Sequence, residues 1–133
     1  MTNLAVQTLP DVERELVALL RAQPELDALQ DRIYTTFPAQ QKGSPATVVV
    51  RRYGGEPVVS RPLVLDEATC QVDVYGGRKA EAADLVALVR ALLVERTPWT
   101  VLGALRYVPD ETFEPPRPRY ILDVLVYLRP HGL

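Results

Sequence analysis

Residues 67–96 read EATCQVDVYGGRKAEAADLVALVRALLVER, and they contain the two strongest secondary-structure signals of the chain. In the first part, apolar and polar residues alternate, which predicts a strand with one face toward the core. The core-facing residues are Ala68, Cys70, Val72 and Val74, and the opposite, exposed face holds Glu67, Thr69, Gln71, Asp73 and Tyr75. After Gly76-Gly77, apolar residues recur with helical spacing from Lys79 to Arg96. A helix of this length measures roughly 27 Å and can cross a small sheet.

Toward the N-terminus, the sequence predicts a second amphipathic helix. It starts at Thr8-Leu9-Pro10-Asp11, where a threonine precedes an acid by three residues and a proline occupies the first turn. Pro24 ends it near Ala22, and one further short turn follows. The apolar positions of the helix and of that turn are Val12, Leu16, Leu19, Leu20, Leu26 and Leu29.

Strand signals occupy most of the remaining chain, and Pro- or Gly-containing segments separate them. The predicted strands are Arg32–Phe37, Thr47–Tyr53, Val58–Tyr75, Trp99–Val108 and Tyr120–Leu128. Within the third, the alternation slips by one residue near Asp66-Glu67, which indicates a bulge or turn. The order αβββαββ predicts an α+β two-layer sandwich, in which a mostly antiparallel sheet of about five strands carries two helices on one face. The whole chain, residues 1–133, is expected to form one domain.

Composition argues against most catalytic chemistry. The 133 residues include one His and one Cys, too few for a disulfide framework or for a zinc site that needs about four Cys and His ligands. His131 lies two residues from the C-terminus, and Cys70 is on the apolar face of its strand. We therefore expect no catalytic residue, no metal and no cofactor. A net charge of −2 gives no reason to expect a nucleic-acid partner, and no apolar run approaches the ~20 residues of a membrane span.

Three alternative sites remain open in the sequence. The carboxylates of Asp66, Glu67, Asp110 and Glu111 suit a small enzyme or a ligand-binding domain if they converge in a pocket. The step from Tyr75 through Gly76-Gly77 to Lys79 has the geometry of an anion site, although it lacks a phosphate-binding motif and a plain turn is favoured. The arginines could form a basic patch for nucleic acid, but interleaved aromatic residues and a nucleic-acid-binding motif are missing, so ion pairing with acids of a neighbouring surface is the better interpretation.

The segment Asp110–Pro118 is a candidate interaction element, with an ordinary surface loop as the equal alternative. It places the aromatic ring of Phe113 among acids and prolines, and prolines reduce the entropy lost when a loop is ordered against a partner. Arginine and acidic side chains elsewhere suit ion pairs across a subunit interface. The candidate subunit or partner interface comprises Arg51, Arg52, Arg61, Asp110, Glu111, Phe113, Glu114, Arg117 and Arg119.

The order and spacing of several segments resemble the tail terminator proteins of long-tailed, non-contractile bacteriophages. These segments are Val12-x-x-x-Leu16, Arg32-Ile33-Tyr34 running to Pro38, Pro45 before Val48-Val49-Val50, Gly54-Gly55, Gln71 to Gly76 leading into Lys79 to Leu85, and Pro118-Arg119-Tyr120. The resemblance covers most of the chain and is weakest over Asp110–Pro118.

This resemblance implies a structural protein of the virion rather than an enzyme. Such a subunit forms a homo-hexameric ring on the end of the tail tube, stops tube polymerisation and meets the head-side connector. Its partners are copies of itself, the tail tube protein and the head-tail connector protein; DNA passes through the ring without being specifically bound, and no membrane is involved. It is expected in the tail or neck of the virion and in the host cytoplasm during assembly. The alternative is another neck, connector or tail-tube subunit.

Overall fold

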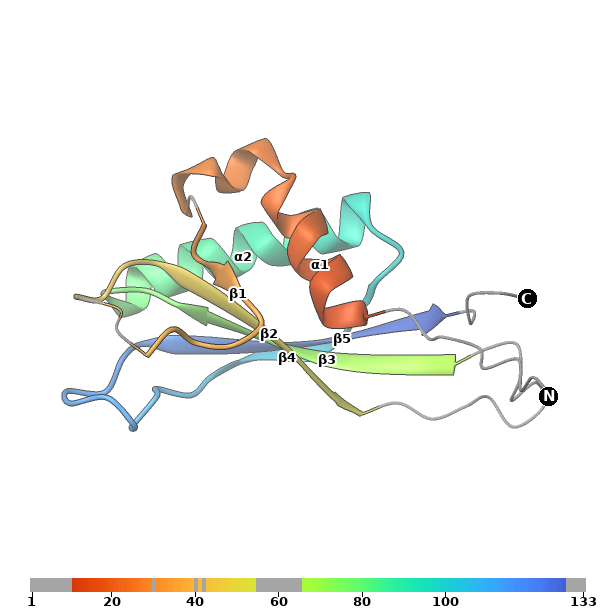
Figure 1. Cartoon of the computed structure of the whole chain (residues 1–133). Coiled ribbons are helices and arrows are strands. Elements are labelled where there is room, and N and C mark those ends of the chain that lie inside the picture. Colours follow the sequence, from red (N-terminus) through yellow and green to blue (C-terminus); the bar gives the residue numbers. More distant parts are fainter. Residues whose placement is uncertain (1–10, 30, 40, 42, 55–65, 129–133) are drawn as a thin grey trace.

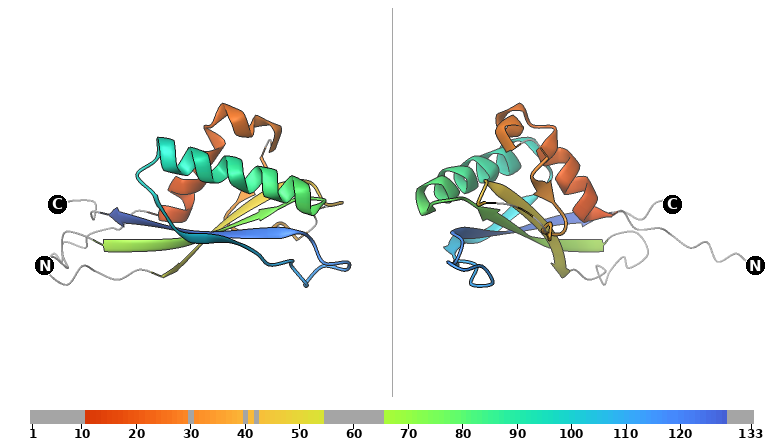
Figure 2. Two further views of the ribbon diagram at one scale, coloured as in Figure 1. Left: turned by 180° about the vertical axis from the view of Figure 1, so that it is seen from behind. Right: turned by 60° about the vertical axis from the view of Figure 1, so that its left-hand side comes forward.

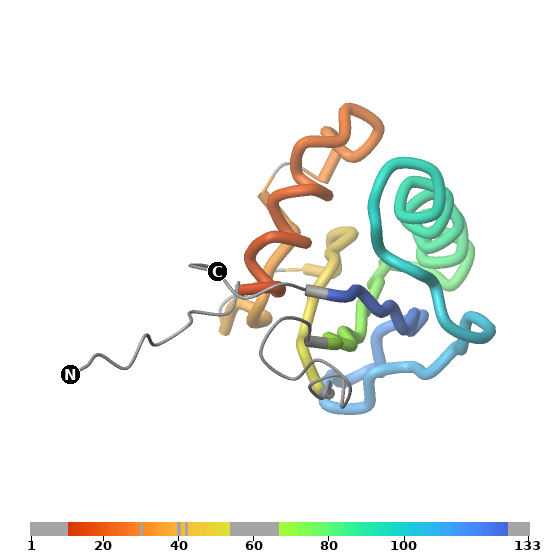
Figure 3. Tube along the Cα trace, turned by 90° about the vertical axis from the view of Figure 1, so that its right-hand side faces the viewer, coloured from red at the N-terminus to blue at the C-terminus, as the bar shows by residue number. Residues whose placement is uncertain are grey.

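The computed structural model shows a five-stranded sheet with both α-helices on one of its faces, which confirms the predicted α+β class (Figure 1). The structure describes residues 11–29, 31–39, 41, 43–54 and 66–128. Its elements are α1 (Val12–Arg21), a 3-10 helix at Pro24–Leu29, β1 (Ile33–Tyr34), β2 (Thr47–Gly54), β3 (Asp66–Tyr75), α2 (Lys79–Arg96), β4 (Thr100–Tyr107) and β5 (Arg119–Leu128). Figure 3 shows the two helices on the same side of the strands.

The strand order is β1-β2-β3-β5-β4, so β3 lies at the centre and β4 forms one edge. All neighbouring strands are antiparallel except β1, which runs parallel to β2. Helix α1 covers the β1–β2 side of the sheet, and α2 crosses β3, β5 and β4 (Figure 2). No helix of the described residues lies on the opposite face of the sheet, which we call the open face.

The core lies between the sheet and the helices. The four alternating residues predicted to face it, Ala68, Cys70, Val72 and Val74, are all fully buried. They meet apolar side chains of both helices, among them Leu16, Leu20, Val86, Val89 and Leu93. The apolar residues that recur every second position in β3 and with helical spacing in α1 and α2 therefore face the same layer.

Two local expectations differ from the structure. The strand predicted at Arg32–Phe37 is wrong beyond two residues: the chain leaves the sheet after Tyr34, because Phe37 packs on the open face instead of continuing the strand. Helix α1 is capped by Asp11, whose side chain accepts a hydrogen bond from the Arg14 backbone N–H at 3.2 Å. The earlier start at Thr8 lies outside the described residues.

The bulge or turn predicted near Asp66-Glu67 is tested only in part: no bulge interrupts the pairing of β3, and a turn before Asp66 would lie outside the described residues. The register between β3 and β5 is unbroken from Asp66 to Tyr75, and the predicted strand residues 58–65 lie outside the described residues. The irregularities occur instead between Arg52 and Gly54 in β2 and between Leu102 and Arg106 in β4. Strands β2 and β3 pair antiparallel, and the residues that connect them, 55–65, lie outside the described residues.

Gly76 is required where β3 turns into α2. A Cβ at this position would lie 2.6 Å from the Ala82 backbone nitrogen, a distance that the backbone must move to relieve. We predict that Gly76→Ala destabilises the protein by about 2 kcal/mol, as overpacking does in a rigid core. At Gly77 the added carbon meets the Glu81 side chain at 3.0 Å and the Ser44 carbonyl oxygen at 3.2 Å, which need to move only a few tenths of an ångström, so Gly77→Ala should cost less in urea-induced unfolding. Equal effects of the two substitutions would contradict the close approach.

Candidate interaction site

Two residues on the polar side of β3 are buried, contrary to the sequence expectation. Asp73 is 1% exposed and Tyr75 is 4% exposed, although both alternate with the core residues and belong to the open face. Tyr75 is covered by the rings of Phe37 and Phe113, and Asp73 is contacted by Arg51 and Arg119. A second, smaller packed layer therefore exists on the open face, at the end of β3 that leads into α2.

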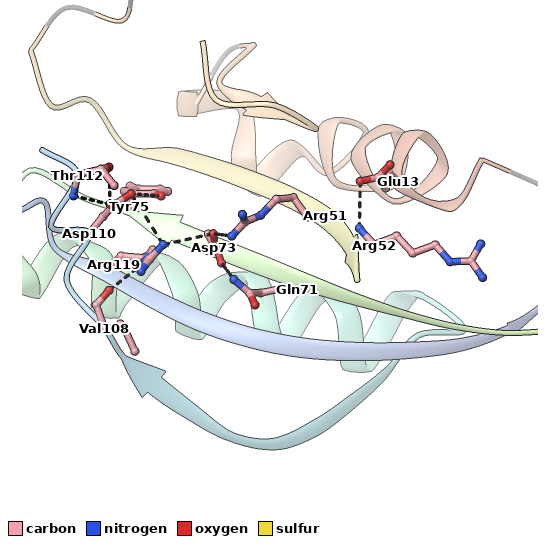
Figure 4. A network of polar contacts seen from close by, with 10 residues as sticks. All are labelled: Glu13, Arg51, Arg52, Gln71, Asp73, Tyr75, Val108, Asp110, Thr112 and Arg119. Carbon is pink, nitrogen blue, oxygen red and sulfur yellow. Dashed lines mark hydrogen bonds and ion pairs between the residues drawn. The ribbon is translucent and has the colours of Figure 1, made fainter. Parts of the chain in front are cut away.

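Asp73 is the centre of a charged network on this layer (Figure 4). Its Oδ2 accepts a 2.6 Å ion-paired hydrogen bond from Arg51 Nη2, and its Oδ1 accepts one at 2.7 Å from Gln71 Nε2. The Arg119 guanidinium lies 3.7 Å from the same carboxylate. These residues come from β2, β3 and β5, so the network ties three adjacent strands together. A buried carboxylate with this many partners has its desolvation compensated.

Asp110 holds the loop between β4 and β5 against the sheet. Its Oδ2 accepts a hydrogen bond from the Tyr75 hydroxyl at 2.7 Å, and its Oδ1 accepts from the Thr112 hydroxyl at 2.6 Å and the Thr112 backbone N–H at 3.0 Å. Arg119 Nη1 lies 3.8 Å from Asp110 Oδ2 and so stands between the two carboxylates (Figure 4). Burial and the Asp110 hydrogen bond both raise the pKa of Tyr75, so its hydroxyl stays protonated and remains a donor.

The ionisation of Asp110 should contribute to stability in a defined pH range. Burial works to raise the pKa of this carboxyl, but hydrogen bonds from Thr112 and Tyr75 outweigh it, and the pKa lies below its ordinary value of 3.8. Because the folded state then binds the proton less tightly than the unfolded state, the stabilisation is complete above about pH 4 and is lost as the pH falls through the folded pKa. We predict that the difference in unfolding free energy between wild type and Asp110→Asn narrows below about pH 4. A constant difference across that range would contradict the assignment.

Arg117 is buried in a cluster of three aromatic rings. Arg117 is 4% exposed, and its guanidinium carbon lies 5.1 to 5.3 Å from the ring centroids of Phe37, Tyr75 and Phe113. The rings also contact each other, with centroids of Phe37 and Tyr75 5.1 Å apart in an edge-to-face arrangement. Cation–π contacts of this kind gain strength when they are desolvated. Burial lowers the pKa of the Arg117 guanidinium.

Arg117 also connects two loops through hydrogen bonds. One terminal nitrogen donates to Gln41 Oε1 at 2.7 Å and the other to the Pro45 carbonyl at 2.7 Å. Its backbone exchanges two hydrogen bonds with Asp110, at 2.8 and 3.1 Å, which closes the loop at its base. The loop between β4 and β5 is therefore held in three ways. Backbone hydrogen bonds between Asp110 and Arg117 close its base, the Phe113 ring packs beside Arg117, and Arg117 bonds to the loop that precedes β2.

An open depression of about 560 Å³ borders this cluster. It is lined by Thr35, Thr36, Phe37, Pro38, Ala39, Val49, Arg51, Asp73, Tyr75, Asp110, Thr112, Phe113 and Arg119. Two arginines and two aspartates balance its charge, and each of these four side chains has an ion pair within the subunit. The chemistry of the depression suits contact with a neutral polar surface, such as another protein.

The acids of the enzyme alternative do not converge. In the register of β3, Glu67 lies eight residues from Tyr75, a separation of roughly 26 Å along the strand, whereas Asp110 is bonded to Tyr75 itself. Asp66 lies at the far end with Glu67. Among the described residues, no group of three His, Cys, Asp or Glu side chains is placed to hold a metal ion. Within the same part of the chain, no helix is long and apolar enough to cross a bilayer.

Five of the nine predicted interface residues meet in this cluster: Arg51, Asp110, Phe113, Arg117 and Arg119. Arg52 points to the helix side of β2, where its backbone N–H donates to the Glu13 carboxylate at 3.0 Å (Figure 4). Glu111 and Glu114 are exposed on the loop, and Arg61 lies outside the described residues. The ring of Phe113 packs inside its own subunit.

The sequence interpretation missed six contributors to the cluster: Phe37, Gln41, Gln71, Asp73, Tyr75 and Thr112. From the sequence, Asp73 and Tyr75 on the polar side of their strand cannot be distinguished from residues of a solvent-exposed face. The pairing of Asp73 with Arg51 and Arg119 becomes visible only once β2, β3 and β5 are placed in register.

A family model described as "Tail completion protein gp17" matches residues 14–112 of the chain, about three-quarters of its length. The match begins within α1, includes β1 to β4 and α2, and ends at Thr112, before Arg117 and β5. No curated protein matches the chain significantly.

Proposed function

The chain belongs to the tail completion protein gp17 family, and we propose on this premise that it caps the bacteriophage tail tube as a ring. Family membership makes it a structural protein of bacteriophage tail assembly and a component of the virion tail. In our proposal, six copies close into a ring on the end of the tube of a long-tailed, non-contractile phage. The ring stops tube polymerisation and offers the surface to which the head-side connector binds.

The observation that carries this proposal is the clamped loop between β4 and β5. Arg117 and the hydrogen bonds of Asp110 hold its base, while Glu111 and Glu114 remain exposed on its outside. A loop that is already ordered loses little entropy on binding, which favours a stable contact with a partner. We assign this loop to contacts with the tube or the connector.

The charge distribution favours the passage of DNA over its binding. On the open face, Arg51 pairs with Asp73, Arg106 pairs with Asp123 at 2.8 Å, and Arg119 lies between Asp73 and Asp110. Arginines that are already paired with carboxylates have little capacity to displace counterions from phosphates, and the chain carries a net charge of −2. Double-stranded DNA can therefore traverse the ring without being retained.

A phage that lacks this protein tests the proposal. We expect overlong tails, or tails without heads, in electron micrographs of the lysate, and restoration of normal particles when the protein is supplied in trans. Tails of normal length attached to heads in its absence would contradict the proposal.

A labelled copy separates the proposal from the tube-subunit alternative. A tail-capping ring carries the label at one position, the head-proximal end of the tail, whereas a tube subunit carries it along the whole length. Label along the whole tube would contradict the capping role and show that the protein is a tube subunit.

A further inference from the structure

Strand β2 has a long strand neighbour on one side and a very short one on the other. Toward β3, its pairing runs from Thr47 to Gly54. Toward β1, only Val48 and Val49 have strand partners, because β1 consists of two residues. Among the described residues, no other strand runs along that side of β2. We call the stretch beyond β1, residues 51–54 on this side, the outer β2 edge.

The backbone N–H of Arg52 points to the outer β2 edge. The N–H of Val48 donates to the Arg32 carbonyl at 2.9 Å, which places it on the β1 side of β2. Because a strand repeats every two residues, the N–H groups of Val50 and Arg52 point to the same side. The register shift in β2 comes only after Arg52, so the alternation holds up to this residue. A further strand beside β2 would therefore accept a hydrogen bond from Arg52.

A side chain of α1 accepts this hydrogen bond instead. The Glu13 Oε2 atom lies 3.0 Å from the Arg52 backbone nitrogen, and the N–H donates to it (Figure 4). Glu13 lies in the first turn of α1, which is capped by Asp11, and a carboxylate is favoured there by the helix dipole. The cap and the packing of α1 on β1 and β2 hold this turn beside the edge. The carboxylate thus replaces the backbone carbonyl of a neighbouring strand.

The other edge of the sheet has a different kind of interruption. In β4, the pairing with β5 shifts between Leu102 and Arg106, and Gly103 within this interval has a positive φ of 65°. Such an irregularity twists an edge strand and breaks the regular row of donors and acceptors that a foreign strand needs. The outer β2 edge keeps its regular alternation as far as Arg52, so its protection has to come from a side chain.

The Glu13 side chain can be reached from solvent. It is half-buried and borders an open depression of about 400 Å³ between α1 and residues 33–36. A strand of another chain that approached the outer β2 edge would have to displace the carboxylate from Arg52 and bring its own carbonyl oxygens close to a negative charge. Charged side chains at sheet edges are a common means of preventing such pairing.

We propose that Glu13 is an autoinhibitory contact that keeps the outer β2 edge closed to a second copy of this chain. Without it, the edges of two copies can pair antiparallel about a two-fold axis, because such a contact uses the same surface on both copies. This inference goes beyond the tail role and does not depend on it, since it concerns how the subunit avoids strand pairing with its own kind.

Hydrogen exchange at the Arg52 amide, measured by NMR at low protein concentration, tests the contact. Glu13→Ala removes the acceptor, and we expect exchange about tenfold faster, the factor that corresponds to one hydrogen bond. Glu13→Asp, which keeps the charge but is one methylene shorter, should act in the same direction and preserve the start of the helix. Glu13→Gln keeps an acceptor oxygen and should retain most of the protection. Glu15→Ala, which removes an exposed carboxylate from the same helix, is the matched control. Unchanged exchange in both Glu13→Ala and Glu13→Asp would contradict the contact.

Sedimentation velocity over a concentration series tests the protective role. Glu13→Ala and Glu13→Asp should form species larger than those of the wild type at the same concentration, and their Arg52 amide should regain protection as they associate. Glu13→Gln and Glu15→Ala should sediment as the wild type does. Wild-type sedimentation of Glu13→Ala and Glu13→Asp despite fast exchange at Arg52 would overturn the proposal. Equal additional association of Glu13→Gln would assign the effect to charge alone and would overturn it as well.

Discussion

Arg117→Ala should destabilise the folded chain by about 3 kcal/mol, the largest effect that we expect from any residue of the loop between β4 and β5. The substitution leaves a void among Phe37, Tyr75 and Phe113, and it removes the donors to Gln41 and to the Pro45 carbonyl. The loop then keeps the bonds of Asp110 but loses its link to the loop that precedes β2. Urea-induced unfolding at neutral pH measures the change.

Arg106→Ala is the matched control for this prediction. Arg106 lies on β4, just before the loop that holds Arg117; its side chain is 51% exposed, and its partner Asp123 is accessible to water. Exposed ion pairs contribute little, so we expect a loss of about 0.5 kcal/mol. If Arg117→Ala were no more harmful than Arg106→Ala, the clamping role of Arg117 would have to be abandoned.

Asp73→Ala should destabilise the fold by about 3 kcal/mol, since removal of one member of a buried, hydrogen-bonded ion network leaves the others uncompensated. The variant deprives Arg51 and Gln71 of their acceptor, and Arg119, whose side chain is 16% exposed, loses one of its two carboxylates. The appropriate measurement is the free energy of unfolding in urea, compared with that of Asp123→Ala.

Asp123 offers a close comparison because it is also an aspartate on the open face, paired with one arginine at 2.8 Å, but its side chain is 23% exposed against 2% for Asp73. We expect Asp123→Ala to cost about 0.5 kcal/mol. Similar costs for the two variants would show that burial of Asp73 does not strengthen its network.

The alternation in residues 67–75 and the helical spacing in residues 79–96 predict most of the architecture, because both patterns report directly on which side chains face the core. Strand β1 was overestimated for a related reason. Residues 32–37 alternate as a strand does, but the Phe37 ring packs against Tyr75 and Phe113 on the open face. Local periodicity carries no information about such a contact between distant segments.

The candidate site was predictable only in part. Arginines and acids near Asp110–Pro118 suggested ion pairing, and Arg51, Arg117 and Arg119 do meet acids or aromatic rings there. The burial of Asp73 was not foreseeable, because it depends on the register that brings Arg51 and Arg119 beside it. The interface role of the nine predicted residues remains a prediction.

The two faces of the sheet hold different features. The helix side of the sheet contains the main core, and the open face contains the Arg117 cluster at one end and the exposed side chains of Tyr53 and Tyr127 at the other. The cluster gives a loop a fixed shape before any partner binds, as preorganised binding requires.

Addition of the purified protein to polymerising tail tubes tests the capping role most directly. Electron microscopy should then show that tube growth stops, with extra density at one end of every tube and a shorter length distribution as more protein is added. Tubes that keep growing at an unchanged rate, with no density at either end, would contradict the proposed function.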